Sequence, residues 1–188
     1  MAKGSGGTRV VKPHNGTFEQ ARRKYLNALS DSRYVPSRSY LSPSGGSLLF
    51  EKGHNVVKEE IEAGRLMADK GYEVVLTPEG GTDTIRKVTK RGSEKFPDGT
   101  IDFISYEQKT PNPAKTDATS RAKNVNNALE HAMKKGADVA FIYDKHGVLH
   151  REDIDSGIHI FENRMPYRFK AILTLNAHGD VHEWYHDK

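Results

Sequence analysis

Hydrophobic positions recur along the chain with the period of a strand in some segments and with the period of a helix in others. From Ser47 onward, segments of the two kinds alternate. Runs rich in Val, Ile, Leu and Phe predict strands, whereas apolar residues three or four positions apart predict helices. Strands are expected at residues 47–50, 73–76, 100–109, 139–143, 169–175 and 181–185. Helices are expected at residues 18–29, 56–70 and 117–135. This interleaving predicts an α/β fold with a mixed central sheet flanked by helices and a C-terminal hairpin.

Glycine, proline and polar clusters set the boundaries of these elements. Asn55 is a plausible N-cap for the first helix of the body, which Gly71 would end. Residues 34–46 are expected to form a loop, residues 82–96 a polar connection, and residues 150–165 either a short helix or a loop. The chain therefore divides into a basic, loop-rich N-terminal arm, residues 1–46, and an α/β domain, residues 47–188.

Composition excludes several classes of protein. The sequence has no cysteine, which rules out disulfides and thiolate metal sites. It has no apolar run near 18 residues, so no membrane span is expected. The start, residues 1–8, is rich in Gly and Ser and lacks the apolar segment of a signal peptide.

The positive charge is concentrated in the first third of the chain. The formal net charge is +4, but residues 1–58 contain ten Lys or Arg and only three acids. The remaining residues contain 19 basic and 22 acidic side chains. A basic arm on a slightly acidic body suits contact with a phosphate backbone, although a solubilising tail accounts for the pattern equally well.

The segment from residue 96 to residue 109 contains the candidate chemistry. In a strand, side chains two positions apart share a face, so Glu107 and Lys109 are expected to point the same way. Asp98 lies nine residues earlier, and a tight turn around residues 104–105 would bring the two acids together. Asp102 is the alternative to Asp98, and strand parity does not decide between them if a bulge intervenes.

Two or three carboxylates beside a lysine suit metal-assisted hydrolysis of a phosphodiester bond. Carboxylates are the oxygen ligands that Mg²⁺ or Mn²⁺ requires, and the lysine can orient a water or stabilise the transition state. The third acid is expected from helix 56–70, where Glu60 lies on a stripe with otherwise apolar or small residues. Glu60 could instead be a boundary residue with a hydrated carboxylate.

These residues make the chain resemble the PD-(D/E)xK toxin nucleases, particularly the tRNase domains at the C-termini of contact-dependent growth inhibition and other polymorphic or phage-borne toxins. The resemblance covers roughly residues 47–188. The matching pieces are Glu60-x2-Ala63, Met67-Ala68, Gly71-Tyr72-x-Val74, Pro97-Asp98 and Glu107-x-Lys109-x-Pro111. The chain departs from the family pattern at Gln108, where the family usually has an apolar residue, and in the additional acid Asp102.

The resemblance implies a metal-dependent endonuclease that acts on RNA, often tRNA, and that a cognate immunity protein neutralises. It implies that Asp98, Glu107 and Glu60 bind Mg²⁺ or Mn²⁺ and that Lys109 is catalytic. It also implies action in the cytoplasm after delivery as part of a larger toxin. A DNA endonuclease of the same fold, or a binding module for nucleic acid or protein without catalysis, is the alternative.

Three further patterns have competing interpretations. Arg121 and Lys123, on helix 117–135, are candidate nucleic-acid contacts, although the basic residues of this helix could simply form its solvated face. Histidines such as His131 could support metal-free RNA cleavage, but no spacing singles out a pair. The sequence from His182 to His186 matches the H-E-x-x-H zinc peptidase motif, which requires a helix, whereas a terminal strand is expected here.

Overall fold

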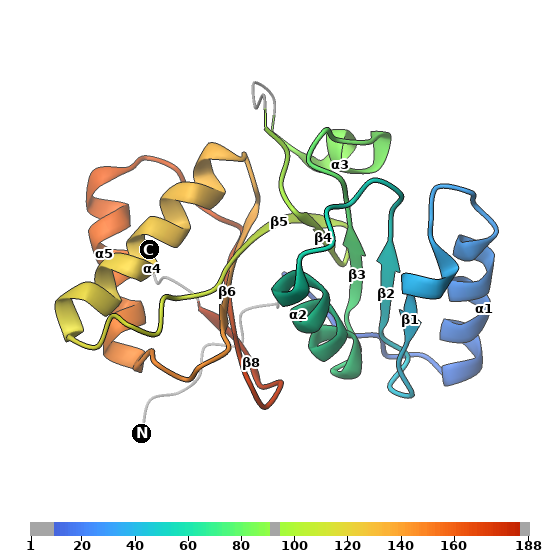
Figure 1. Cartoon of the computed structure of the whole chain (residues 1–188), viewed down its shortest axis with the longest axis horizontal. Helices are drawn as coiled ribbons and strands as arrows, with labels where there is room; N and C mark the ends of the chain where they lie inside the picture. Colours follow the sequence, from blue (N-terminus) through green and yellow to red (C-terminus); the bar gives the residue numbers. More distant parts are fainter. Residues whose placement is uncertain (1–9, 91–94, 185–188) are drawn as a thin grey trace.

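The computed structural model describes residues 10–90 and 95–184, and its centre is a mixed sheet of eight strands (Figure 1). The strands are neighbours in chain order: β1 (Tyr40–Leu41), β2 (Ser47–Phe50), β3 (Glu73–Leu76), β4 (Gly99–Ile101), β5 (Ile104–Lys109), β6 (Val139–Asp144), β7 (Ala171–Asn176) and β8 (Val181–Trp184). The helices are α1 (Phe18–Leu29), α2 (Lys58–Asp69), α3 (Asp83–Val88), α4 (Ala118–Lys134) and α5 (Arg151–Arg164), with a 3-10 turn η1 (Pro36–Arg38). The predicted α/β class is confirmed.

Helices connect the parallel strand pairs and hairpins connect most of the antiparallel ones. Strands β2 and β3, β5 and β6, and β6 and β7 pair in parallel, and their connections contain α2, α4 and α5 respectively. The other neighbours are antiparallel. Parallel neighbours require a crossover connection, because the chain leaves one strand at its C-terminal end and must return to the opposite end of the sheet to begin the next. The β4–β5 hairpin forms the centre of the sheet. In the sequence it lies between α2 and α4.

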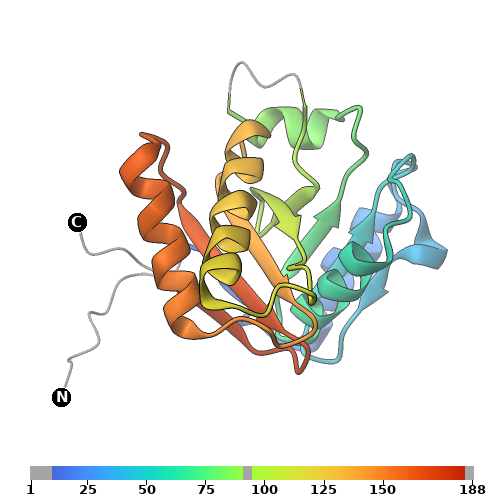
Figure 2. The same ribbon diagram turned by 60° about the vertical axis from the view of Figure 1, so that its left-hand side comes forward.

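The two faces of the sheet bury different helices, as the alternation along β6 shows. Phe141 and Tyr143 pack in the core beneath α2, whereas Ala140 and Ile142 pack against α4 and α5. Figure 2 shows α4 and α5 side by side over this part of the sheet. No helix in the described ranges is long and apolar enough to cross a membrane.

The described part of the predicted N-terminal arm packs on the sheet. Val11 is fully buried in the core beneath α2, and the His14 N–H donates to the carbonyl of Gly71. Residues 34–46, expected as loop, contain η1 and β1, which pairs with β2. The expected boundary at residues 46 and 47 thus lies within the β1–β2 hairpin. A strand of two residues is too short for periodicity to reveal it.

Several other expectations differ from the structure. The polar connection expected at residues 82–96 contains α3. Of the two alternatives for residues 150–165, the helix is confirmed, as α5. Helix α2 begins after Val57, which provides no side-chain cap, rather than after Asn55. The extended segment expected at residues 100–109 consists of two strands, β4 and β5, joined by a tight turn as the spacing of Asp98 and Glu107 predicts.

Gly157 lets α5 pack closely on α4, the helix that faces the site. A Cβ at this position would lie 2.4 Å from Val125 Cβ and 2.7 Å from the carbonyl oxygen of Ala122. We expect Gly157→Ala to destabilise the fold by about 1–3 kcal/mol, because overpacking exceeds the gain in helix propensity. Urea unfolding measures the change, with Gly80→Ala as the control since no atom lies within 4 Å of that Cβ. Unchanged stability of Gly157→Ala would contradict this account of the packing.

Candidate active site

The β4–β5 hairpin brings Asp98 and Glu107 together. Its turn is formed by Asp102 and Phe103, which both have positive φ angles (50° and 63°), so the turn lies two residues before the expected position. Gly99 pairs with Tyr106, which places Asp98 beside Glu107 just beyond the paired residues. The backbone N–H of Asp98 donates to Glu107 Oε2 at 3.1 Å.

Helix α4 and its C-cap residue provide a histidine and a lysine as partners for the buried carboxylate of Glu107. The side chain of Glu107 is only 3% exposed. His131 Nε2 lies 2.7 Å and Lys135 Nζ 3.7 Å from Glu107 Oε1. Lys135 also donates to the carbonyl of Phe96 at 3.2 Å. A buried carboxylate requires such partners because its desolvation is costly.

Asp98 is less well compensated than Glu107. Its Oδ2 accepts the backbone N–H of Gln108 at 2.8 Å. Burial, followed by the negative charges of Glu107 and Glu60, raises the pKa of Asp98 well above its usual value. Lys135 and the Gln108 hydrogen bond oppose this rise without cancelling it. The ionised form of Asp98 is therefore disfavoured in the folded protein, first by burial and then by its acidic neighbours.

Glu60 reaches the site from the first turn of α2. Its Oε2 lies 2.7 Å from Nε2 of His54, a buried residue that precedes the helix. The neighbouring acid Glu62 instead accepts hydrogen bonds from Tyr143 and Lys145 at 2.7 and 3.0 Å. Helix α2 thus directs one glutamate toward Asp98 and another toward β6.

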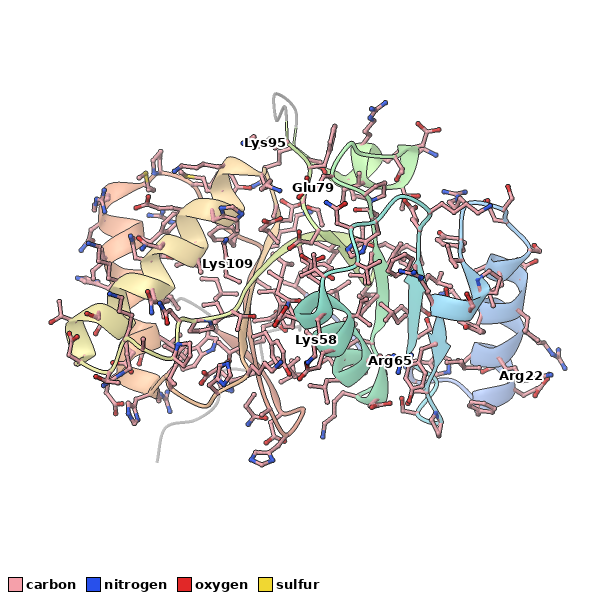
Figure 3. The ribbon with its side chains drawn as sticks, in the orientation of Figure 1. Arg22, Lys58, Arg65, Glu79, Lys95 and Lys109 are labelled. Atoms are coloured by element: carbon pink, nitrogen blue, oxygen red, sulfur yellow. The ribbon has the colours of Figure 1, made fainter. Side chains whose placement is uncertain are left out.

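A pocket of about 470 Å³ collects these side chains. Its lining residues are Glu60, Glu79, Lys95, Asp98, Glu107, Gln108, Lys109, His131 and Lys135. Lys109 is exposed and lines two adjacent pockets as well. Figure 3 shows Lys109 on β5, between α4 and α2. All four residues predicted to form the catalytic centre therefore line one pocket.

Gln108, the departure from the family pattern, lines the pocket and contacts α2. Its Nε2 donates to the carbonyl of Glu59 at 3.0 Å and so connects β5 to the first turn of α2. A polar residue at this position therefore has a structural role in holding α2 against the strand.

The donor chemistry of the pocket fits a divalent cation. Carboxylate oxygens of Asp98, Glu107 and Glu60 are hard ligands. Burial, together with the charges of Glu107 and Glu60, raises the pKa of Asp98, and a bound cation would favour its ionised form. Within residues 10–90 and 95–184, no three acids or histidines already stand close enough together to form a metal centre. The pocket thus fits a divalent cation by the type and the charge of its ligands. Asp98, Glu107 and Glu60 are the residues that would hold the ion.

Other predicted site residues lie elsewhere. Asp102, in the hairpin turn, accepts the backbone N–H of Lys12 at 3.2 Å and does not line the pocket. Arg121 pairs with buried Asp153 at 2.7 Å and donates to the carbonyl of Thr116, so it connects α4 to α5. Lys123 is exposed, and its contact with nucleic acid remains a prediction.

The H-E-x-x-H match begins on a strand. His182 and Trp184 belong to β8, and their rings lie 4.5 Å apart. Trp184 Nε1 donates to Thr174 at 3.0 Å. His186 lies outside the described residues. The three described residues of the motif thus form a strand rather than the helix that a zinc peptidase requires.

His131 and Lys135 are site residues that the sequence interpretation did not place. The sequence predicts for His131 only an unpaired candidate for metal-free RNA cleavage, and it leaves Lys135 among the basic residues of its helix, as nucleic-acid contacts or as a solvated face. Their spacing of four residues is the sequence feature that indicates a shared site, because it places them one turn apart at the C-terminal end of α4. Both contact Glu107 in the structure.

Comparison with known proteins adds one structural likeness. No family model and no curated protein matches the chain. The structure is similar to a chain of the CdiA-CT/CdiI toxin and immunity complex from Burkholderia pseudomallei, with a TM-score of 0.48 and 16% sequence identity over 72% of this chain and 97% of that chain. A likeness of this degree does not assign an activity to the chain.

Proposed function

We propose that this chain is a metal-dependent endonuclease that hydrolyses phosphodiester bonds in RNA. The observation that supports the proposal most directly is the shared pocket of Asp98, Glu107 and Lys109, together with the raised pKa of Asp98. Buried carboxylates that would hold a divalent cation, beside an exposed lysine, suit hydrolysis of an anionic ester.

The side chains have distinct tasks in this proposal. When bound, Mg²⁺ or Mn²⁺ supplies an activated water and offsets negative charge. Asp98, Glu107 and Glu60 hold the ion, and His131 keeps the Glu107 carboxylate in place through their 2.7 Å contact. Lys109 contacts the phosphate oxygens, where charge grows as the bond breaks.

The choice of RNA, the role as a toxin-type effector and an immunity protein as partner rest on the sequence resemblance. A partner that neutralises the enzyme would cover the catalytic pocket, which is lined by four acids and three lysines.

A gel assay of the purified chain tests the proposal. Total tRNA and plasmid DNA are each incubated with Mg²⁺ or with EDTA. We expect cleavage of tRNA in Mg²⁺ and none in EDTA. Cleavage of plasmid alone would reassign the substrate to DNA. Cleavage that persists in EDTA would move the chemistry to the His131–Glu107 pair. A folded protein that cuts neither substrate would contradict the proposal and favour a binding module.

A further inference from the structure

A second pocket of about 330 Å³ adjoins the catalytic pocket, and Lys109 and His131 line both. It lies between α4 and the segment that follows β5. Its lining residues are Lys109, Thr110, Pro111, Asn112, Asn124, Val125, Asn127, Ala128, His131 and Ile142. The proposed nuclease mechanism assigns no task to this second pocket.

The lining of this second pocket combines apolar surface with neutral amides. Val125 and Ile142 are almost completely buried and provide the apolar part. Asn112, Asn124 and Asn127 each carry both a hydrogen-bond donor and an acceptor. No carboxylate lines the pocket, in contrast to the catalytic pocket next to it. Neutral amides around an apolar surface suit a planar group with polar edges better than they suit a phosphate or a metal ion.

One of these amides contains a buried donor without a hydrogen-bond partner. Nδ2 of Asn124 is buried and has no hydrogen-bond partner within the described residues. A buried donor without a partner costs free energy, so a ligand acceptor that reaches it would be bound favourably. Asn112 has its Oδ1 occupied by the N–H of Ala114 at 3.0 Å, which leaves its NH₂ group to donate.

We propose that this second pocket binds the nucleobase adjacent to the scissile phosphate. A base has apolar faces and an edge that mixes donors and acceptors, and asparagine carboxamides pair with such edges. The volume lies at the lower end for ligand pockets, which suits one base rather than a larger group. The proposal rests on the proposed function, because Lys109 lines both pockets and would hold the phosphate between them.

Nucleotide binding without metal tests the pocket independently of catalysis. Adenosine, guanosine, cytidine and uridine monophosphates are titrated into the protein in EDTA, and NMR shifts give each Kd. We expect at least one of the four to bind, and Asn127→Ala and Asn124→Ala to weaken that binding about 10-fold or more. Asn127 is exposed, so its substitution leaves the fold intact. Asn163→Ala is the matched control, since Asn163 lies on α5 and its amide contacts His159.

Three outcomes would overturn this assignment. They are absence of binding of all four nucleotides, equal binding of ribose 5-phosphate, which lacks a base, and unchanged affinity in both asparagine variants. Failure of the nuclease proposal looks different: wild type would bind nucleotides through the asparagines but cut no substrate. Conversely, metal-dependent cleavage whose KM is the same in wild type and Asn127→Ala would retain the nuclease and reject the base pocket.

Discussion

Replacing Lys109 with alanine is expected to lower the rate of RNA cleavage by about 100- to 1,000-fold, the usual effect of losing one preorganised group that stabilises developing charge. The ammonium of Lys109 has no side-chain partner among the described residues, and the side chain is exposed in the catalytic pocket. Its removal therefore breaks no ion pair that stabilises the fold. Single-turnover cleavage with Mg²⁺ in excess measures the chemical step, and urea unfolding is expected to show unchanged stability.

The control for this substitution is Lys52→Ala, which removes the same charge from an exposed position outside the pocket. A general weakening of RNA binding by lost positive charge would affect both variants and would diminish at high salt. Loss of the chemical step in Lys109→Ala alone supports the assigned role. Wild-type cleavage rates in Lys109→Ala would remove Lys109 from the active site and favour the pair formed by His131 and Glu107.

The parts of the site that lie on strands could be predicted because strand geometry is local. Side-chain parity placed Glu107 and Lys109 on one face, and a hairpin was sufficient to bring Asp98 beside Glu107. The turn position was wrong by two residues because two consecutive non-glycine residues, Asp102 and Phe103, adopt left-handed backbone angles. Such residues rarely do so, and composition gives no indication of it.

The contributions of α4 could not be predicted in the same way. A helical pattern shows which face is apolar, but not which strand end lies opposite its polar residues. His131 and Lys135 become site residues only because α4 packs across β5 and β6, where Glu107 is buried. Arg121 shows the converse, since a basic residue that suggested nucleic-acid contact pairs with buried Asp153 instead. Distant packing partners determine these roles, and the local sequence does not contain them.

Asp98→Asn is expected to have opposite effects on activity and stability. The variant removes a proposed metal ligand and should reduce Mg²⁺-dependent cleavage at least about 100-fold, since metal assistance contributes several kcal/mol. The same substitution should stabilise the metal-free fold at neutral pH. Burial and the charges of Glu107 and Glu60 raise the pKa of Asp98, so its ionised form destabilises the folded state. Asparagine removes the charge and can still accept the Gln108 N–H.

The sign of the pH dependence follows from proton binding. With its raised pKa, Asp98 holds a proton in the folded protein at pH values where the unfolded chain has released it. Its contribution to stability therefore falls as pH rises from the unfolded pKa, about 4, through the raised folded value. In EDTA, the melting temperature of Asp98→Asn should exceed that of wild type at pH 7–8, by roughly 2–4 °C for each kcal/mol gained. The two proteins should converge as pH falls below the unfolded pKa, where the carboxyl is protonated in both states.

Adding Mg²⁺ separates the metal-site interpretation from a purely structural one. A cation bound only by the folded protein raises its melting temperature, so wild type should gain stability in Mg²⁺ while Asp98→Asn gains much less. Mg²⁺ should therefore narrow or reverse the difference measured in EDTA. Equal responses of the two proteins would place the ion elsewhere. A lower melting temperature for Asp98→Asn in EDTA at pH 7–8 would mean that protein groups already offset the carboxylate, and the charge argument for a cation at Asp98 would fail.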